Sequence, residues 1–186
     1  DPSRPSRVNP ERIVEALEDH PITYSFGSPT IWRRVSAYCD AKGIHVNSPR
    51  SIMMAGAPIP GPLHQQVKRM FAAGTEIHTP YGATEALPVS SITASEVLNG
   101  CWEATERGAG VCVGTPQRDI LTRIIEIRDE PIARWNDDLV RPVGEVGEIV
   151  VKGPIVSAEY YGLPEQNRLA KIYEGNEVWH RIGDVG

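Results

Sequence analysis

The first half of the chain alternates short apolar runs with longer segments whose apolar residues recur at helical spacing. In residues 10–20, 29–42 and 60–73 they fall three and four positions apart, which places them on one face of a helix. Asn9 and Ser28 each precede a proline, a pattern typical of helix starts because the capping side chain can accept a hydrogen bond from the first turn. We therefore expect a helix in each of the three segments.

Between these helices, residues 22–26, 51–55 and 76–79 have the length and composition of strands. The run 51–55 is continuously apolar, which is typical of a parallel strand covered on both faces. Strands and helices in this order favour a parallel sheet with crossover helices. Such sheets bind ligands at the carboxyl edge of their strands, where we expect residues 56–58 and the turn at 81–82 to lie.

A different pattern begins at residue 108. The capping box at 93–96 predicts one more helix before that point. Residues 120–128 and 146–152 are β-rich runs joined by polar turns, and they predict an antiparallel meander or a small barrel. The expected fold class is α/β, with a parallel-sheet subdomain followed by a small antiparallel β-barrel-like subdomain.

The domain boundaries follow from these patterns. We expect a linker at residues 1–8, where the composition is polar and proline-rich, an α/β subdomain at 9–107 and a β-rich subdomain at 108–186. The chain has no initiating methionine and ends directly after a strand-like segment, so we expect it to be a piece of a larger protein.

Composition and charge narrow the function classes. A chain of 186 residues with 40% apolar and 23% charged residues is ordinary for a globular protein. The formal net charge of −5 disfavours a nucleic acid partner. No apolar run approaches the ~20 residues of a membrane span. Cys39, Cys101 and Cys112 lack metal-site spacing, so we expect buried thiols in a reducing compartment and a cytoplasmic location.

The residues after the third predicted strand combine several kinds of ligand-binding group. Gly82 lets a flat ligand approach the ring of Tyr81, because it has no Cβ. Thr84 can donate a hydrogen bond to an anionic oxygen, and Glu85 offers the hard oxygen ligands that magnesium prefers. Asp184, near the other end of the chain, could accept the two hydroxyl groups of a ribose.

A second group of residues could complete such a site. Gly56, Ala57 and Pro58 could form a small apolar wall that holds a purine against Tyr81. His78 precedes Tyr81 on the same strand end, whereas the other histidines are scattered and no pair has zinc-ligand spacing. Together these parts would make an AMP site. An α/β domain with ordinary turns explains the same pattern equally well.

Four motifs occur in the same order and spacing as in a known family. They are GAP at 56–58, YGATE at 81–85, GEVGEIVVKGP at 144–154 and WHRIGD at 179–184. This series resembles the adenylate-forming superfamily of AMP-dependent synthetases and ligases. The resemblance implies that the chain is part of the large N-terminal domain of such an enzyme, with ATP or AMP and Mg²⁺ as cofactors. Ile182 stands where the family usually has threonine.

The resemblance also implies individual roles. Tyr81 would pack on adenine, Thr84 would touch the AMP phosphate, Glu85 would bind magnesium and Asp184 would hold the ribose. Residues 158–161 stand where a GYW-like sequence is common. The family's phosphate loop and lysine-bearing carboxyl-terminal domain are not in this sequence, so we expect the piece alone to be inactive. The catalytic candidates are Thr84 and Glu85, and the cofactor-binding candidates are Gly56, Ala57, Pro58, His78, Tyr81, Gly82, Thr84 and Asp184.

Within the superfamily, residues 25–29, 32–35 and 81–88 are most similar to the β-lactone synthetases of bacterial long-chain olefin biosynthesis. Such enzymes adenylate a β-hydroxy fatty acid, whose own hydroxyl then attacks the activated carbonyl and expels AMP. The alternative is a fatty acyl-CoA synthetase, which uses coenzyme A instead. A non-catalytic nucleotide-binding module is the alternative from another class. The partners implied are a fatty or β-hydroxy fatty acid and other enzymes of the same pathway.

Overall fold

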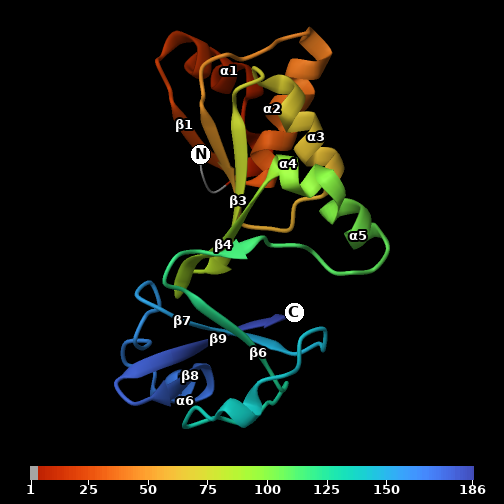
Figure 1. The fold of residues 1–186 in the computed structure, drawn as a ribbon. Coiled ribbons are helices and arrows are strands. Elements are labelled where there is room, and N and C mark those ends of the chain that lie inside the picture. Colours follow the sequence, from red (N-terminus) through yellow and green to blue (C-terminus); the bar gives the residue numbers. More distant parts are fainter. Residues whose placement is uncertain (1–3) are drawn as a thin grey trace. The chain divides into compact units, whose positions relative to one another are not determined.

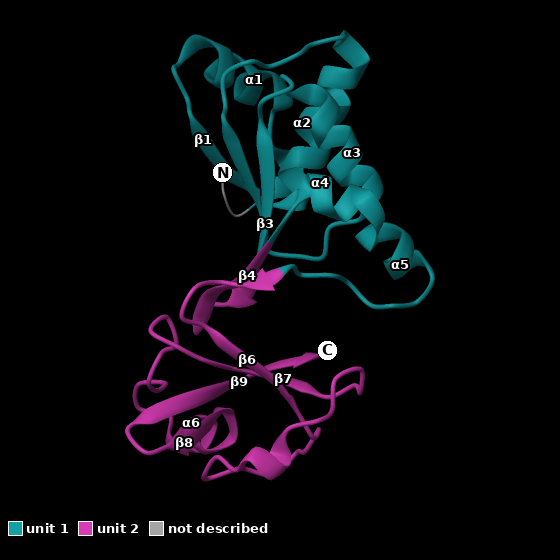
Figure 2. Ribbon diagram, in the orientation of Figure 1, with its two compact units in different colours: residues 1–80, 92–114 teal, residues 81–91, 115–186 magenta. Residues whose placement is uncertain are grey.

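The structure, a computed structural model, describes residues 4–186 (Figure 1). It divides into two compact units, each built from two stretches of chain (Figure 2). Unit 1 contains the residues up to 80 together with 92–114, and unit 2 contains 81–91 together with 115–186.

The amino-terminal linker and the domain boundaries were predicted at residues 1–8, 9–107 and 108–186. Residues 1–3 lie outside the described part of the chain, and Pro5–Arg7 forms a short 3-10 helix. The two predicted domain boundaries stay a prediction.

Unit 1 has the predicted alternation of strands and helices. Its three strands run parallel, with Phe26 opposite Met53 and Met53 opposite His78, so the predicted parallel sheet with crossover helices is confirmed. The elements, in chain order, are α1 (Pro10–Asp19), β1 (Tyr24–Gly27), α2 (Pro29–Lys42), β2 (Ser51–Met54), α3 (Gly61–Met70) and β3 (Glu76–Ala83).

Local signals in the sequence account for several helix ends of unit 1, but the cap predicted at Ser28 is wrong, because its side chain makes no capping hydrogen bond with α2. The Asn9 side chain accepts a hydrogen bond from the Glu11 amide at 3.0 Å and caps α1. Gly43 ends α2 with a φ of 65°, a left-handed conformation that glycine adopts without strain. The apolar faces of these helices pack against alternate residues of the sheet and form the core. Trp32 and Val35 of α2 and Ile52 of β2 belong to this core.

The other face of the sheet of unit 1 is open within residues 4–186. Tyr24 and Phe26 of β1 are 68% and 69% exposed, and Met53 of β2 is 44% exposed. The prediction that residues 51–55 form a strand covered on both faces is therefore wrong for the described chain. Ile52 and Met54 are buried, but Met53 alternates with them and points away from the core.

A β-hairpin was not predicted in the region of Tyr81. The sequence suggested a turn at 81–82, but β3 continues through both residues to Ala83. A two-residue turn, Thr84 and Glu85, then leads into β4 (Ala86–Thr93). Gly82 and Pro88 made these strands difficult to predict from the sequence, because glycine and proline are usually depleted in strand interiors. The first sheet thus contains parallel strands followed by the antiparallel pair β4 and β5 (Thr115–Pro116).

Thr93 begins the last helical region of unit 1, and its predicted capping box is confirmed. The Thr93 side chain accepts a hydrogen bond from the Glu96 amide, and the Glu96 carboxylate accepts one from the Thr93 amide at 2.8 Å. The helical segments are α4 (Ala94–Glu96), the segment Val97–Cys101, which is kinked at Asn99 and Gly100, and α5 (Trp102–Glu106).

Unit 2 contains a four-stranded antiparallel sheet in the order β6-β7-β9-β8. The sheet is open, so the predicted barrel-like closure is wrong, and β9 lies between β7 and β8, which a meander would not allow. The cause is the β8–β9 hairpin, whose second strand pairs back onto β7. The elements are β6 (Leu121–Ile125), β7 (Glu148–Lys152), α6 (Pro164–Ala170), β8 (Lys171–Glu174) and β9 (Glu177–Val185).

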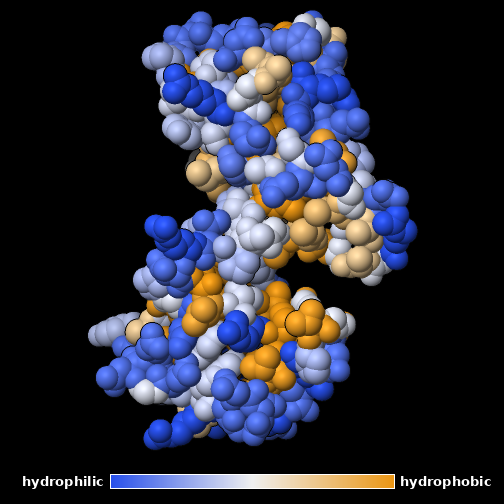
Figure 3. All heavy atoms as spheres, in the orientation of Figure 1, coloured by the Kyte–Doolittle hydropathy of each residue, from blue (hydrophilic) through white to orange (hydrophobic). Residues whose placement is uncertain are grey.

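The structure can be compared with the expectations for membrane spans and for the cysteines. No helix in residues 4–186 has the length and apolar content needed to cross a membrane. Of the three free cysteines, Cys39 is buried as expected, but Cys101 is half-buried and Cys112 is exposed. Figure 3 shows hydrophilic residues over the upper part of unit 1 on this face, with apolar patches on the lower part of unit 1 and on unit 2. The exposed apolar side chains of unit 2 include Val143 and Val146.

Candidate functional site

Tyr81 and Asp184 lie 103 positions apart in the chain but meet within unit 2. The Tyr81 hydroxyl donates a hydrogen bond to Asp184 Oδ2 at 2.8 Å. Burial, together with this bond and the charge of the aspartate, raises the pKa of Tyr81 above its ordinary value, so the phenol keeps its proton. The structure therefore joins two residues that the sequence assigned to one site.

Glu85 occupies the turn of the β3–β4 hairpin. Its Oε1 atom accepts a hydrogen bond from the Tyr160 hydroxyl at 2.8 Å. That bond lowers the pKa of Glu85, and the nearby charges of His180 and Lys171 act in the same direction. The carboxylate is therefore ionised at neutral pH. Thr84, the other residue of the turn, is exposed to solvent.

A buried lysine lies beside this carboxylate. Lys171, the first residue of β8, is 1% exposed, and its Nζ donates hydrogen bonds to the backbone oxygen and Oγ of Ser157 at 2.6 and 3.1 Å. The Nζ also lies 5.4 Å from the centre of the Tyr160 ring. Burial lowers the pKa of Lys171.

The sequence reasoning gave no role to Tyr160 or Lys171. The sequence did contain one signal for Lys171, which is the charged residue within the otherwise mostly apolar run 169–173. A lysine is rarely buried in such a run unless it has partners. His180 is 2% exposed, and its Nδ1 lies 3.2 Å from the backbone oxygen of Ala170. The buried imidazole of His180 therefore has a backbone partner.

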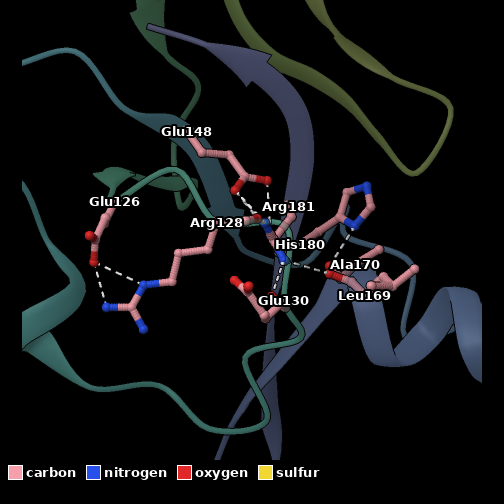
Figure 4. Close-up of polar contacts among 8 residues, drawn as sticks. All are labelled: Glu126, Arg128, Glu130, Glu148, Leu169, Ala170, His180 and Arg181. Carbon is pink, nitrogen blue, oxygen red and sulfur yellow. Dashed lines mark hydrogen bonds and ion pairs between the residues drawn. The ribbon is translucent and has the colours of Figure 1, made fainter.

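The strand that carries Asp184 is fixed by an ion pair (Figure 4). The Arg181 side chain donates hydrogen bonds to both oxygens of Glu148, and the two side chains are only 9% and 10% exposed. The same guanidinium donates to the backbone oxygens of Glu130 and Leu169, each at 3.1 Å, and to that of Arg128. These contacts anchor β9 three residues before Asp184.

The donor set around Glu85 fits a magnesium ion brought by a nucleotide. Across residues 4–186, no cluster of three or more histidine, cysteine, aspartate or glutamate side chains could hold a metal by itself. Magnesium is commonly bound through one or two carboxylates together with substrate phosphates. The ionised, partly exposed Glu85 could supply such a single protein ligand.

The remaining predicted residues belong to unit 1. Gly56, Ala57 and Pro58 follow the carboxyl end of β2 and are exposed, and Gly56 has a φ of 101°. His78 lies on β3 and is half-buried. Their participation in one site with Tyr81 stays a prediction.

Comparison with known proteins identifies the family. Residues 2–161 match the family model described as AMP-binding enzyme. The whole chain is 38% identical to the olefin beta-lactone synthetase of Stenotrophomonas maltophilia, of which it covers 34%. It is 26% identical to the long-chain-fatty-acid–CoA ligase of Thermus thermophilus, with 96% of this chain and 31% of that protein covered.

A solved structure shows the same fold. The amide bond synthetase McbA from Marinactinospora thermotolerans superposes with a TM-score of 0.72 at 23% identity, over 96% of this chain and 32% of that one. The chain spans about a third of the length of the curated relatives described above. Since the family match covers most of the residues, the chain belongs to the AMP-binding enzyme family.

Proposed function

We propose that these residues are part of an ATP- and magnesium-dependent enzyme that activates a β-hydroxy fatty acid as its acyl-AMP and closes it to a β-lactone. The observation that carries the proposal is the 38% identity to an olefin beta-lactone synthetase over the whole chain. Family membership supports the adenylate chemistry, and the identity supports the choice of substrate and product.

The nucleotide end of the site would be formed by the residues of unit 2 described above. The ring of Tyr81 would pack on adenine, while its hydroxyl holds the Asp184 carboxylate at 2.8 Å. That bond uses Oδ2 of Asp184, which leaves Oδ1 to accept from a ribose hydroxyl. Gly82 would shape the hairpin that carries Tyr81, and Gly56, Ala57, Pro58 and His78 are the further cofactor-binding residues that the family resemblance implies.

The phosphate end would be formed by the hairpin turn. The exposed Thr84 hydroxyl would donate to an α-phosphate oxygen, and the Glu85 carboxylate would bind the metal. Magnesium, when bound, would offset the negative charge of the phosphates. The acid carboxylate would attack the α-phosphorus and release pyrophosphate. The β-hydroxyl would then attack the acyl carbonyl, lose its proton and expel AMP.

A fatty acyl-CoA synthetase is the second candidate. The 26% identity to a long-chain-fatty-acid–CoA ligase favours it. The first half-reaction, formation of the acyl-AMP, would be the same in both candidates. The thiol of coenzyme A would then attack the acyl-AMP in place of the internal hydroxyl, and a thioester would form.

Product analysis distinguishes the two candidates. The full-length enzyme is incubated with ATP, magnesium and a long-chain β-hydroxy acid, with and without coenzyme A, and the products are identified by mass spectrometry. We expect a β-lactone and AMP in both reactions. A thioester that forms only with coenzyme A, with no lactone, would overturn the proposal in favour of the ligase, and the absence of AMP from both reactions would overturn the adenylate chemistry.

A further inference from the structure

Glu85 is held at two points by one short segment of unit 2. Its carboxylate accepts from the Tyr160 hydroxyl at 2.8 Å, and its backbone oxygen accepts from the Ser157 amide at 2.8 Å. One contact restrains the side chain, and the other restrains the turn that carries it. The direction of the carboxylate is therefore set from outside the hairpin.

Lys171 connects these two points of support. Its Nζ donates to the backbone oxygen and Oγ of Ser157, and it lies 5.4 Å from the centre of the Tyr160 ring, within the range of a cation–π contact. A lysine that is 1% exposed needs such partners, because an unpaired buried ammonium is strongly unfavourable. The two oxygens, the ring and the negative charge of Glu85 compensate it together.

We propose that Tyr160 and Lys171 are positioning residues that aim the Glu85 carboxylate at a nucleotide-bound divalent cation. The inference rests on the proposed function, in which Glu85 is the metal ligand. Magnesium demands near-ideal octahedral geometry, so a ligand held in one direction binds it better than a freely rotating one. The hydrogen bond from Tyr160 occupies Oε1 of Glu85 and leaves Oε2 for the cation.

The contrasting explanation is that the Tyr160 hydroxyl only stabilises the fold. The two roles differ in one measurable respect, namely whether loss of the hydroxyl weakens nucleotide binding only when a metal is present. Loss of a partner that orients a metal ligand commonly weakens metal affinity by about 10- to 100-fold. A structural defect would weaken the binding of metal-free nucleotide as well.

The experiment compares the affinity of the full-length enzyme for manganese–ATP and for metal-free ATP by titration calorimetry, without acid substrate. The variants are Glu85→Gln, Tyr160→Phe and the double variant. Tyr161→Phe is the matched control, since it makes the same change at an adjacent tyrosine that is 96% exposed. We expect Glu85→Gln and Tyr160→Phe each to weaken manganese–ATP binding by about 10-fold or more, with metal-free ATP unaffected. The double variant should be no weaker than Glu85→Gln, because both changes disable the same ligand.

The outcomes separate this inference from the proposed function. If Glu85→Gln weakens manganese–ATP binding and Tyr160→Phe does not, the positioning role is overturned and the proposed metal ligand stands. If Glu85→Gln has no effect, the metal assignment fails, and the positioning role fails with it.

Lys171→Met tests the second positioning residue. We expect it to weaken manganese–ATP binding in the same direction, and thermal unfolding shows whether the variant is folded. A folded Lys171→Met variant with unchanged binding would remove Lys171 from the inference. Tyr160→Phe, which deletes one oxygen atom, keeps the central claim testable if Lys171→Met does not fold.

Discussion

Arg181 shows how a residue outside the proposed site can determine its geometry. Its guanidinium binds Glu148 and three backbone oxygens, so one side chain holds β7, β9, α6 and the segment 128–130 together. A buried ion pair gains little over an apolar pair of the same size, but removing one partner leaves the other charge uncompensated. The stability of β9, and with it the place of Asp184, should depend on both partners.

We expect Arg181→Met to lower the free energy of unfolding by about 3–5 kcal/mol, because the Glu148 carboxylate would remain buried without its partner. Urea denaturation of the chain measures this loss. Arg168→Met is the control, since Arg168 pairs with Glu165 on the surface, where such pairs contribute about 1 kcal/mol or less. Equal losses in both variants would contradict the structural role of Arg181.

At the scale of elements, the β3–β4 hairpin depends on Gly82. A Cβ at this position would lie 2.3 Å from the backbone oxygen of Ala86 on the facing strand, and the φ of 154° is one that other residues rarely adopt. The close approach of the two strands therefore requires glycine. This requirement is independent of any ligand that the hairpin binds.

We expect Gly82→Ala to lower the free energy of unfolding by about 1–3 kcal/mol, through backbone strain and the clash with Ala86. Gly175→Ala is the comparison variant. It has a φ of 61° and nothing lies within 4 Å of the added Cβ, so it reports the cost of a positive φ without a clash. Thermal or urea unfolding of both variants is the measurement, and a Gly82→Ala variant as stable as the parent would show that the strands can separate without cost.

The elements also show what could be predicted from the sequence. The helix starts at Asn9 and Thr93 depend on neighbouring residues, and their caps are present as predicted. The strand β4 was missed because Pro88 obscures it, and its partners are set by contacts that no local pattern encodes. The predicted strand order of unit 2 was wrong for the same reason. β9 pairs with β7 although α6 and β8 lie between them in the sequence.

The residues of the candidate site could also be predicted only in part. The YGATE and WHRIGD motifs identified Tyr81 and Asp184 through family resemblance, and the two side chains do meet. Tyr160 and Lys171 could not be assigned, because their contacts with Glu85 and Ser157 join residues 75 and 14 positions apart, respectively. Such contacts depend on the finished packing rather than on any spacing in the sequence.

At the scale of the whole molecule, unit 2 is assembled from two separate stretches of chain. Residues 81–91 contribute Ala86 and Val89 to a buried cluster, and residues 115–186 contribute Ile120 and Val151 to the same cluster. The second stretch also has a core of its own, which includes Ile125 and Trp179, but it buries Ile120 and Val151 only together with the first stretch. The hydrophobic effect therefore makes the stability of the second stretch depend in part on the first.

We expect residues 115–186 alone to unfold at a lower urea concentration than the same residues joined to 81–91, because Ile120 and Val151 would lose their cover. A short glycine–serine linker can make this join, because Ser91 and Thr115 are paired neighbours in the β4–β5 ladder. Urea denaturation followed by circular dichroism compares the two. Equal, cooperative unfolding of both chains would show that the first stretch is dispensable.

The two-part construction of unit 2 also has an evolutionary consequence. Tyr81 lies in its first stretch and Asp184 in its second, with 92–114 between them in the other unit. A single recombination event that exchanged only the carboxyl-terminal stretch between relatives would pair the tyrosine of one parent with the aspartate strand of another. Such chimeras would carry mismatched cores around Ala86 and Val151, so we expect natural exchange to preserve both stretches together as one inherited block.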